Sequence, residues 1–91
     1  MVKQTKNSKQ TFRLVAPDAR TVLLVGDFTS WQQQPIPMHM DEDGIWTTSV
    51  DLPAGKHTYR FIVDGDWRDD PKCTLRVPNS FGGQDMVREA T

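Results

Sequence analysis

The stretch that decides the fold reads His57-Thr58-Tyr59-Arg60-Phe61-Ile62-Val63-Asp64-Gly65-Asp66-Trp67. Alternate side chains of a strand share a face, which here puts Tyr59, Phe61 and Val63 together on one apolar side. The Asp64-Gly65 pair that follows is typical of a tight hairpin turn. The pattern predicts a strand over residues 57–64 with one buried face, and then a reversal of the chain.

Similar segments lie on both sides of this strand. Residues 11–16 alternate, residues 20–25 are rich in β-branched side chains, residues 45–52 follow an Asp-Gly turn, and residues 84–89 close the chain. Gly- and Pro-containing turns separate them, and no segment shows apolar residues at helical spacing. Short strands at intervals of about 8–12 residues are typical of an all-β sandwich or a small barrel with antiparallel sheets.

The length of 91 residues fits a single domain. The first residues are polar and include Lys3, Lys6 and Lys9, so we expect residues 1–9 to form a disordered tail. Residues 10–91 are then expected to form one β-sandwich domain. That length leaves room for a binding module but not for a catalytic domain beside it.

The charge balance argues against nucleic acid as a partner. The chain has 11 basic and 12 acidic residues, a net charge of −1, so it has no bulk basic surface for phosphates. No stretch is long and apolar enough to span a membrane, and residues at the start lack the apolar core of a signal peptide. The single cysteine, Cys73, allows no internal disulfide. We therefore expect a cytoplasmic protein that binds neither nucleic acid nor membranes.

Catalytic and metal-binding patterns are missing from the sequence. Ser30 and Ser80 lack the surroundings of an activated nucleophile, and the two histidines are unpaired. The acidic run 41–44 is similar to the start of a calcium loop, but its twelfth position is Leu52 rather than Glu. The other acids lie in turns, where solvent keeps carboxylates ionised. The chain is expected to be no enzyme and to need no cofactor or metal.

Two of the three tryptophans occupy unusual positions. Trp31 and Trp67 each follow a sharp turn, outside the inward-facing strand residues, whereas Trp46 lies on the apolar face of its strand. Each of the two could cover an edge of the core. Arg60 favours another interpretation, because it points away from the apolar face on the strand that leads to Trp67. Two indole planes and a forked donor on one rim suit a sugar, whose C–H face packs on aromatic rings while its hydroxyls accept hydrogen bonds.

An ordered set of short motifs resembles one family. In sequence order they are Phe28-Thr29-Ser30-Trp31, Pro37-Met38, Asp43-Gly44-Ile45-Trp46, Asp51-Leu52-Pro53-Ala54-Gly55, Tyr59-Arg60-Phe61-Ile62-Val63-Asp64-Gly65-Asp66-Trp67 and Asp70-Pro71. The chain resembles the glycogen-binding domain of the AMP-activated protein kinase beta subunit, within carbohydrate-binding module family 48. The N-terminal domains of isoamylase and branching enzymes are similar. The resemblance covers about residues 10–89.

The resemblance implies an early-set immunoglobulin-like antiparallel β-sandwich that binds α-1,4-linked glucans such as glycogen, starch or maltooligosaccharides without cleaving them. Trp31 and Trp67 match the family's sugar-stacking tryptophans. Arg60 matches a basic contact residue that is usually Lys, and its planar fork changes the contact geometry. A kinase or a glycogen-metabolising enzyme is then a candidate protein partner.

The family's last binding loop matches residues 79–85. Phe81 stands where an apolar residue inserts into the glucan curve, although it could equally plug the core at the base of the loop. Asp85 stands where Asn is common and lacks the amide donor, so Gln84 could take its place. Gly83 completes the expected site. The alternative to sugar binding is a protein-interaction or regulatory sandwich with weak or no affinity for glucans.

Overall fold

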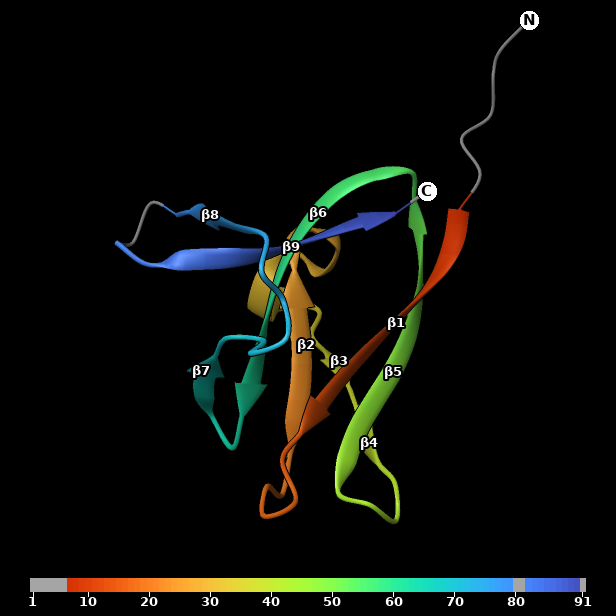
Figure 1. The fold of residues 1–91 in the computed structure, drawn as a ribbon, viewed down its shortest axis with the longest axis vertical. Helices are drawn as coiled ribbons and strands as arrows, with labels where there is room; N and C mark the ends of the chain where they lie inside the picture. The colour runs from red at the N-terminus through yellow and green to blue at the C-terminus, as the bar shows by residue number, and fades with distance from the viewer. Residues whose placement is uncertain (1–6, 80–81, 91) are drawn as a thin grey trace, which may run out of the picture.

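The computed structural model describes residues 7–79 and 82–90. Strands dominate, with two short 3-10 turns called η1 and η2 (Figure 1). The elements are, in chain order, β1 (Asn7–Val15), β2 (Val22–Gly26), η1 (Asp27–Thr29), η2 (Trp31–Gln33), β3 (Ile36–Pro37), β4 (His39–Met40), β5 (Ile45–Pro53), β6 (Gly55–Val63), β7 (Asp66–Arg68), β8 (Arg76–Pro78) and β9 (Gln84–Ala90). Within the described ranges, no helix is long and apolar enough to cross a membrane.

The strands form two antiparallel sheets. One has the order β1-β5-β4, and the other has the order β3-β2-β6-β9-β8, with β7 also paired to β6. The chain passes from the second sheet to the first at Met38, which is buried between β3 and β4. The prediction of an all-β fold with antiparallel sheets packed as a sandwich is confirmed.

The core lies between the two sheets and is built from alternate residues of each strand. Tyr59, Phe61 and Val63 of β6 are 1%, 0% and 6% exposed, as the alternation predicts. Across the gap, the ring of Phe12 on β1 meets Tyr59 edge-on, with centroids 4.8 Å apart. Trp46 on β5 is also buried, and its Nε1–H donates to the carbonyl oxygen of Ala16 at 2.8 Å.

Strand β6 organises the larger sheet because two strands share one of its edges. β2 pairs with residues 59–63 of β6 along one edge. Along the other edge, β9 pairs with residues 55–59 and β7 with residues 61–63. The second edge therefore forks at Arg60, where β9 leaves β6 and β7 begins. Figure 1 shows β7 and the β8–β9 pair diverging from β6 on the same side.

The turn from β6 to β7 has the backbone that its sequence predicts. Asp64 and Gly65 both have positive φ, 50° and 87°, which is the geometry of a two-residue hairpin turn of type I′. The carboxylate Oδ1 of Asp64 accepts hydrogen bonds from the backbone N–H groups of Arg20 (2.8 Å) and Thr21 (2.9 Å). The turn is thus fixed to the loop before β2, and Trp67 follows two residues later.

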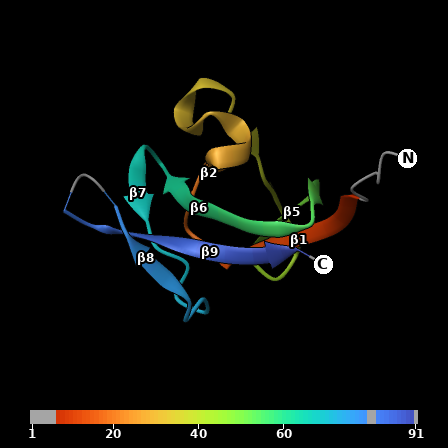
Figure 2. The same ribbon diagram turned by 90° about the horizontal axis from the view of Figure 1, so that it is seen from above.

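Two local expectations differ from the structure. Residues 7–9 belong to β1 and pair with residues 51–53 of β5, so the strand takes up three residues that were expected in the disordered tail. Polar side chains are tolerated there because this part of the strand faces solvent. Residues 30–37, whose glutamines and prolines predict a loop rather than a helix, contain η2, and η1 lies directly before them. Both 3-10 turns stand on one side of the larger sheet (Figure 2).

Candidate functional site

The outer face of β6, opposite the core, carries Arg60 and Ile62. Ile62 pairs with Trp67 of β7, so Trp67 lies on the same outer face. Val25 of β2 pairs with Arg60 and also belongs to this face, yet it is 0% exposed. Both 3-10 turns contact β2 and cover the sheet there. The 3-10 turns therefore cover the outer face at Val25, whereas the face is open to solvent beside Trp67.

Trp31 reaches this face through an irregular segment of backbone. Ser30 and Trp31 have φ values of 51° and 56°, a left-handed conformation that L residues seldom adopt. The buried Thr29 holds the segment: its Oγ1 accepts from Gly26 N–H at 3.0 Å and lies 2.7 Å from the carbonyl oxygen of Trp31. A Cβ on Gly26 would collide with the carbonyl oxygen of Thr58 on β6, so glycine is required for the close approach.

The two indole rings lie side by side at the surface. The ring centroids of Trp31 and Trp67 are 6.3 Å apart, and their planes are inclined by 41°. Trp67 is 40% exposed, and Trp31 is partly exposed. The guanidinium carbon of Arg60 lies 5.5 Å from the ring centroid of Trp67, within range of a cation–π contact. The structure thus brings together the three residues on which the sequence argument rested.

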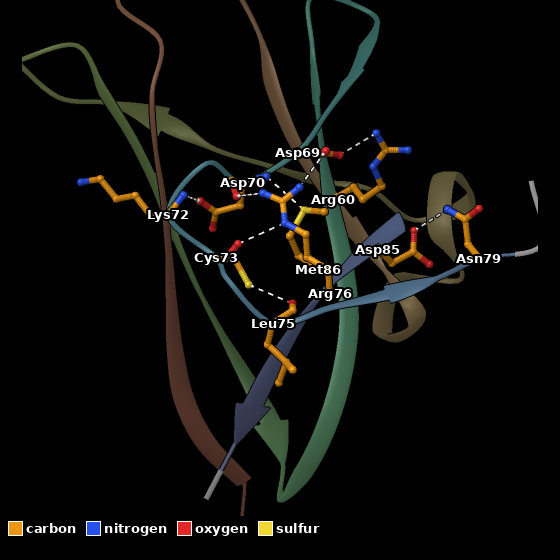
Figure 3. Close-up of polar contacts among 10 residues, drawn as sticks. All are labelled: Arg60, Asp69, Asp70, Lys72, Cys73, Leu75, Arg76, Asn79, Asp85 and Met86. Carbon is orange, nitrogen blue, oxygen red and sulfur yellow. Dashed lines mark hydrogen bonds and ion pairs between the residues drawn. The ribbon is translucent and has the colours of Figure 1, made fainter. Parts of the chain in front are cut away.

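Arg60 is held by a carboxylate rather than projecting freely. Its Nη2 donates to Oδ1 of Asp69 at 2.9 Å, and Nη1 of Arg76 donates to the other oxygen of Asp69 at 3.1 Å (Figure 3). Arg76 also donates to the backbone carbonyls of Cys73 and Asp70, both at 3.2 Å. The bridge links the end of β7 to the start of β8. It leaves the Arg60 side chain only 22% exposed.

A buried hydrogen bond lies beneath this bridge. Asp70, 7% exposed, accepts from the hydroxyl of Tyr59 at 2.8 Å and from the backbone N–H of Lys72 at 3.0 Å. Burial, assisted by the hydrogen bond to Asp70, raises the pKa of the Tyr59 hydroxyl well above its usual range. Asp70 is thus not the solvated turn residue expected from the sequence. It anchors the chain directly after Asp69 to the core strand.

The residues expected in the last binding loop do not all lie on the face of Arg60. Asp85 comes directly before Met86, which pairs with Tyr59, so strand alternation places Asp85 on the face of Arg60. Its Oδ1 accepts a hydrogen bond from Asn79 Nδ2 at 3.0 Å. Gly83 is exposed and its N–H donates to Asn79 Oδ1 at 3.0 Å. Gln84 is exposed, and strand alternation directs it to the face opposite Asp85. Phe81 lies outside the described residues.

Asp69 and Arg76 are the residues that sequence reasoning missed. Asp69 stands two positions after Trp67, so strand alternation alone could have put it on the side of Trp67. No comparable signal existed for Arg76, because the segment between them is irregular. In the part of the chain that the structure describes, no group of three or more His, Cys, Asp or Glu side chains could hold a metal ion.

Comparisons with known proteins identify the family of the chain. The sequence model of the glycogen recognition site of AMP-activated protein kinase matches residues 10–84. The chain is similar to a 1,4-alpha-glucan branching enzyme of Lactobacillus acidophilus, with 40% identity over 58 residues, which are 64% of this chain and 9% of that protein.

Two further relatives come from a plant and from an animal. The chloroplastic PTST homolog 2 of Arabidopsis thaliana is 41% identical over 75 residues, 81% of this chain and 13% of the relative. The human beta-2 subunit of 5'-AMP-activated protein kinase is 33% identical over 70 residues, 77% of this chain and 25% of the relative. The chain therefore spans a quarter or less of the length of these three proteins. Because the family model matches most of its length, the chain belongs to the family of glycogen recognition sites of AMP-activated protein kinase.

Proposed function

We propose that this chain binds α-1,4-linked glucans, with Trp31 and Trp67 stacking on glucose rings and Arg60 donating hydrogen bonds to sugar hydroxyls. The observation that carries the proposal is the pair of surface indoles, 6.3 Å apart and inclined by 41°. Rigid aromatic rings provide a large contact area at a small cost in conformational entropy.

The inclination of the rings favours one class of glucan. Successive glucose rings of an α-1,4 chain tilt with respect to one another, so the chain curves. Two inclined indoles match neighbouring rings of such a chain, whereas a flat β-1,4 ribbon requires coplanar platforms. The tilt therefore supports glycogen, starch or maltooligosaccharides as ligands over cellulose-like chains.

Hydrogen bonds would come from the edge of the site. Arg60 lies against Trp67, and the exposed glutamines at 32–34 follow Trp31 directly. Such groups exchange water for sugar hydroxyls at little net gain, so the affinity should be modest. Asp85 is on the same face as Arg60 and can accept from a hydroxyl, although its carboxylate already accepts from Asn79.

The proposed role is binding without catalysis. The matched family is a recognition site, and the proposed contacts are aromatic stacking and hydrogen bonding rather than general acid–base chemistry. A glycoside hydrolase needs two carboxyl groups on either side of the scissile bond, one of them with a raised pKa. The two carboxylates beside the site are instead engaged within the protein: Asp69 accepts from Arg60 and Asp70 accepts from the hydroxyl of Tyr59. We further propose that the chain brings a kinase or a glucan-metabolising enzyme to its glucan, by analogy with its relatives.

The experiment is a titration of intrinsic tryptophan fluorescence with maltoheptaose, with cellohexaose as the matched β-linked control. We expect a saturable change with maltoheptaose, little change with cellohexaose, and co-sedimentation of the chain with glycogen. A folded protein that gives no change with maltoheptaose and stays in solution beside glycogen would overturn the proposal. The alternative, a protein-interaction module without useful sugar affinity, would then hold.

A further inference from the structure

The formal charges beside Trp67 cancel. Two arginines and two aspartates, Arg60, Arg76, Asp69 and Asp70, gather between the end of β7 and the start of β8 (Figure 3). We call them the arginine–aspartate cluster. Asp69 bridges the two guanidinium groups, and the carbonyl oxygen of Asp70 accepts from Arg76. The cluster therefore presents arginine side chains at the site without a net positive charge.

Asp69 occupies the side of Arg60 that would recognise an anion. The Nη2 group of Arg60 lies 2.9 Å from Asp69 Oδ1, and Arg60 Nε is buried without a hydrogen-bond partner among the described residues. Arginine binds phosphates and carboxylates through two parallel N–H groups. With Nη2 bonded to Asp69 and Nε buried, the guanidinium cannot offer the fork formed by Nε and Nη2 to an incoming anion. A single N–H directed at a neutral hydroxyl is compatible with the same geometry.

The carboxylates near the cluster also disfavour an anionic ligand. Asp85, directly before Met86, lies on the face of Arg60, and the side chain of Asp69 is 44% exposed. An anionic group on a sugar bound at Trp67 would approach these carboxylates with the charge of Arg60 already compensated. A neutral sugar has no such repulsion.

We propose that Asp69 is a specificity-determining residue that selects neutral glucans over phosphorylated or otherwise anionic ones. It does so by holding the guanidinium of Arg60 against Trp67 and by compensating its charge. This inference rests on the proposed binding of glucans. Asp69 then restricts the ligands to one class, uncharged α-glucans.

The test compares two ligands that share one ring. β-Cyclodextrin and carboxymethyl-β-cyclodextrin are titrated at low ionic strength into the unaltered chain and into Asp69→Asn, which keeps the side-chain size and one acceptor oxygen. We expect the ratio of anionic to neutral affinity to rise about three- to fivefold in Asp69→Asn, the size of one exposed charge pair. The rise should shrink at high salt, because exposed charges are screened. Asp69→Glu, which keeps the charge, should stay close to the unaltered chain.

A matched control removes the same charge elsewhere. Asp51→Asn lies on β5 of the other sheet, where Asp51 is exposed. In Asp51→Asn the ratio of anionic to neutral affinity should stay unchanged. If Asp69→Asn leaves the ratio unchanged, or if Asp51→Asn raises it equally, the role of Asp69 is wrong while glucan binding stands. If the unaltered, folded chain binds neither ligand nor glycogen, the proposed function fails first and the inference fails with it.

Discussion

The two faces of β6 use similar side chains for different purposes. On the inner face, Tyr59, Phe61 and Val63 are at most 6% exposed and fill the space between the sheets. On the outer face, Trp67 is 40% exposed and lies beside Trp31, with the two ring planes inclined by 41°. The inner aromatics stabilise the fold by leaving water altogether. The outer ones keep part of their apolar surface exposed to solvent.

The largest expected effects come from truncating one aromatic ring on each face, because one loss should lower stability and the other should weaken binding. Phe61→Ala removes a fully buried ring and should lower the free energy of unfolding by about 3–5 kcal/mol. Trp67→Ala removes a larger but exposed ring. It should lower the free energy of unfolding by about 1 kcal/mol or less while weakening maltoheptaose binding more than about tenfold. Urea unfolding followed by circular dichroism and a binding titration measure both variants. Equal loss of stability in the two variants would abolish the distinction between the faces.

An intermediate effect is expected where the inner face supports the outer one. Tyr59→Phe leaves the buried Asp70 without its hydroxyl donor and should cost about 1–3 kcal/mol in unfolding free energy. Asp70 adjoins Asp69, so glucan affinity should also fall slightly. Urea unfolding and titration at one pH check both effects. A fully stable Tyr59→Phe variant would show that the buried bond contributes nothing to the support of the site.

The smallest effect is expected at the turn that ends β6, which belongs to neither face. Hydrogen bonds from the backbone of Thr21 and Arg20 lower the pKa of Asp64. A lowered pKa in the folded state stabilises the fold above the unfolded-state pKa of about 3.9, and this contribution is lost as the pH falls through the folded-state value. Asp64→Asn should therefore flatten the loss of stability below about pH 4. Urea midpoints measured from about pH 2 to about pH 7 give the slope. An unchanged slope would show that these hydrogen bonds do not stabilise the charged form of Asp64.

The fold could be predicted from the sequence because its strands follow a simple rule. The alternation at 59, 61 and 63 gave the buried face of β6, and Asp64-Gly65 gave the turn to β7. Trp46 was assigned to the core for the same reason, and it is buried. Each of these signals is local, and tertiary packing agrees with it.

The rest depends on contacts that local patterns do not contain. Trp31 takes a left-handed backbone that is rare for a bulky residue, and it does so because Thr29 and the close approach at Gly26 hold the segment. Asp70 looks like a turn residue but is buried by Tyr59. The meeting of Arg60 with Asp69 and Arg76 arises at the fork in the sheet, which joins three strands. The sugar contacts of the expected site residues stay predictions.

The most direct test of the account follows the indole N–H signals of the three tryptophans by NMR during titration with maltoheptaose. If glucan binds at the outer face, the signals of Trp31 and Trp67 shift with ligand and saturate together. The Trp46 signal should stay in place, because its N–H is bonded to Ala16 inside the sandwich. A Trp46 signal that shifts as far as the other two, or Trp31 and Trp67 signals that do not move with ligand, would contradict the assignment of binding to the outer face.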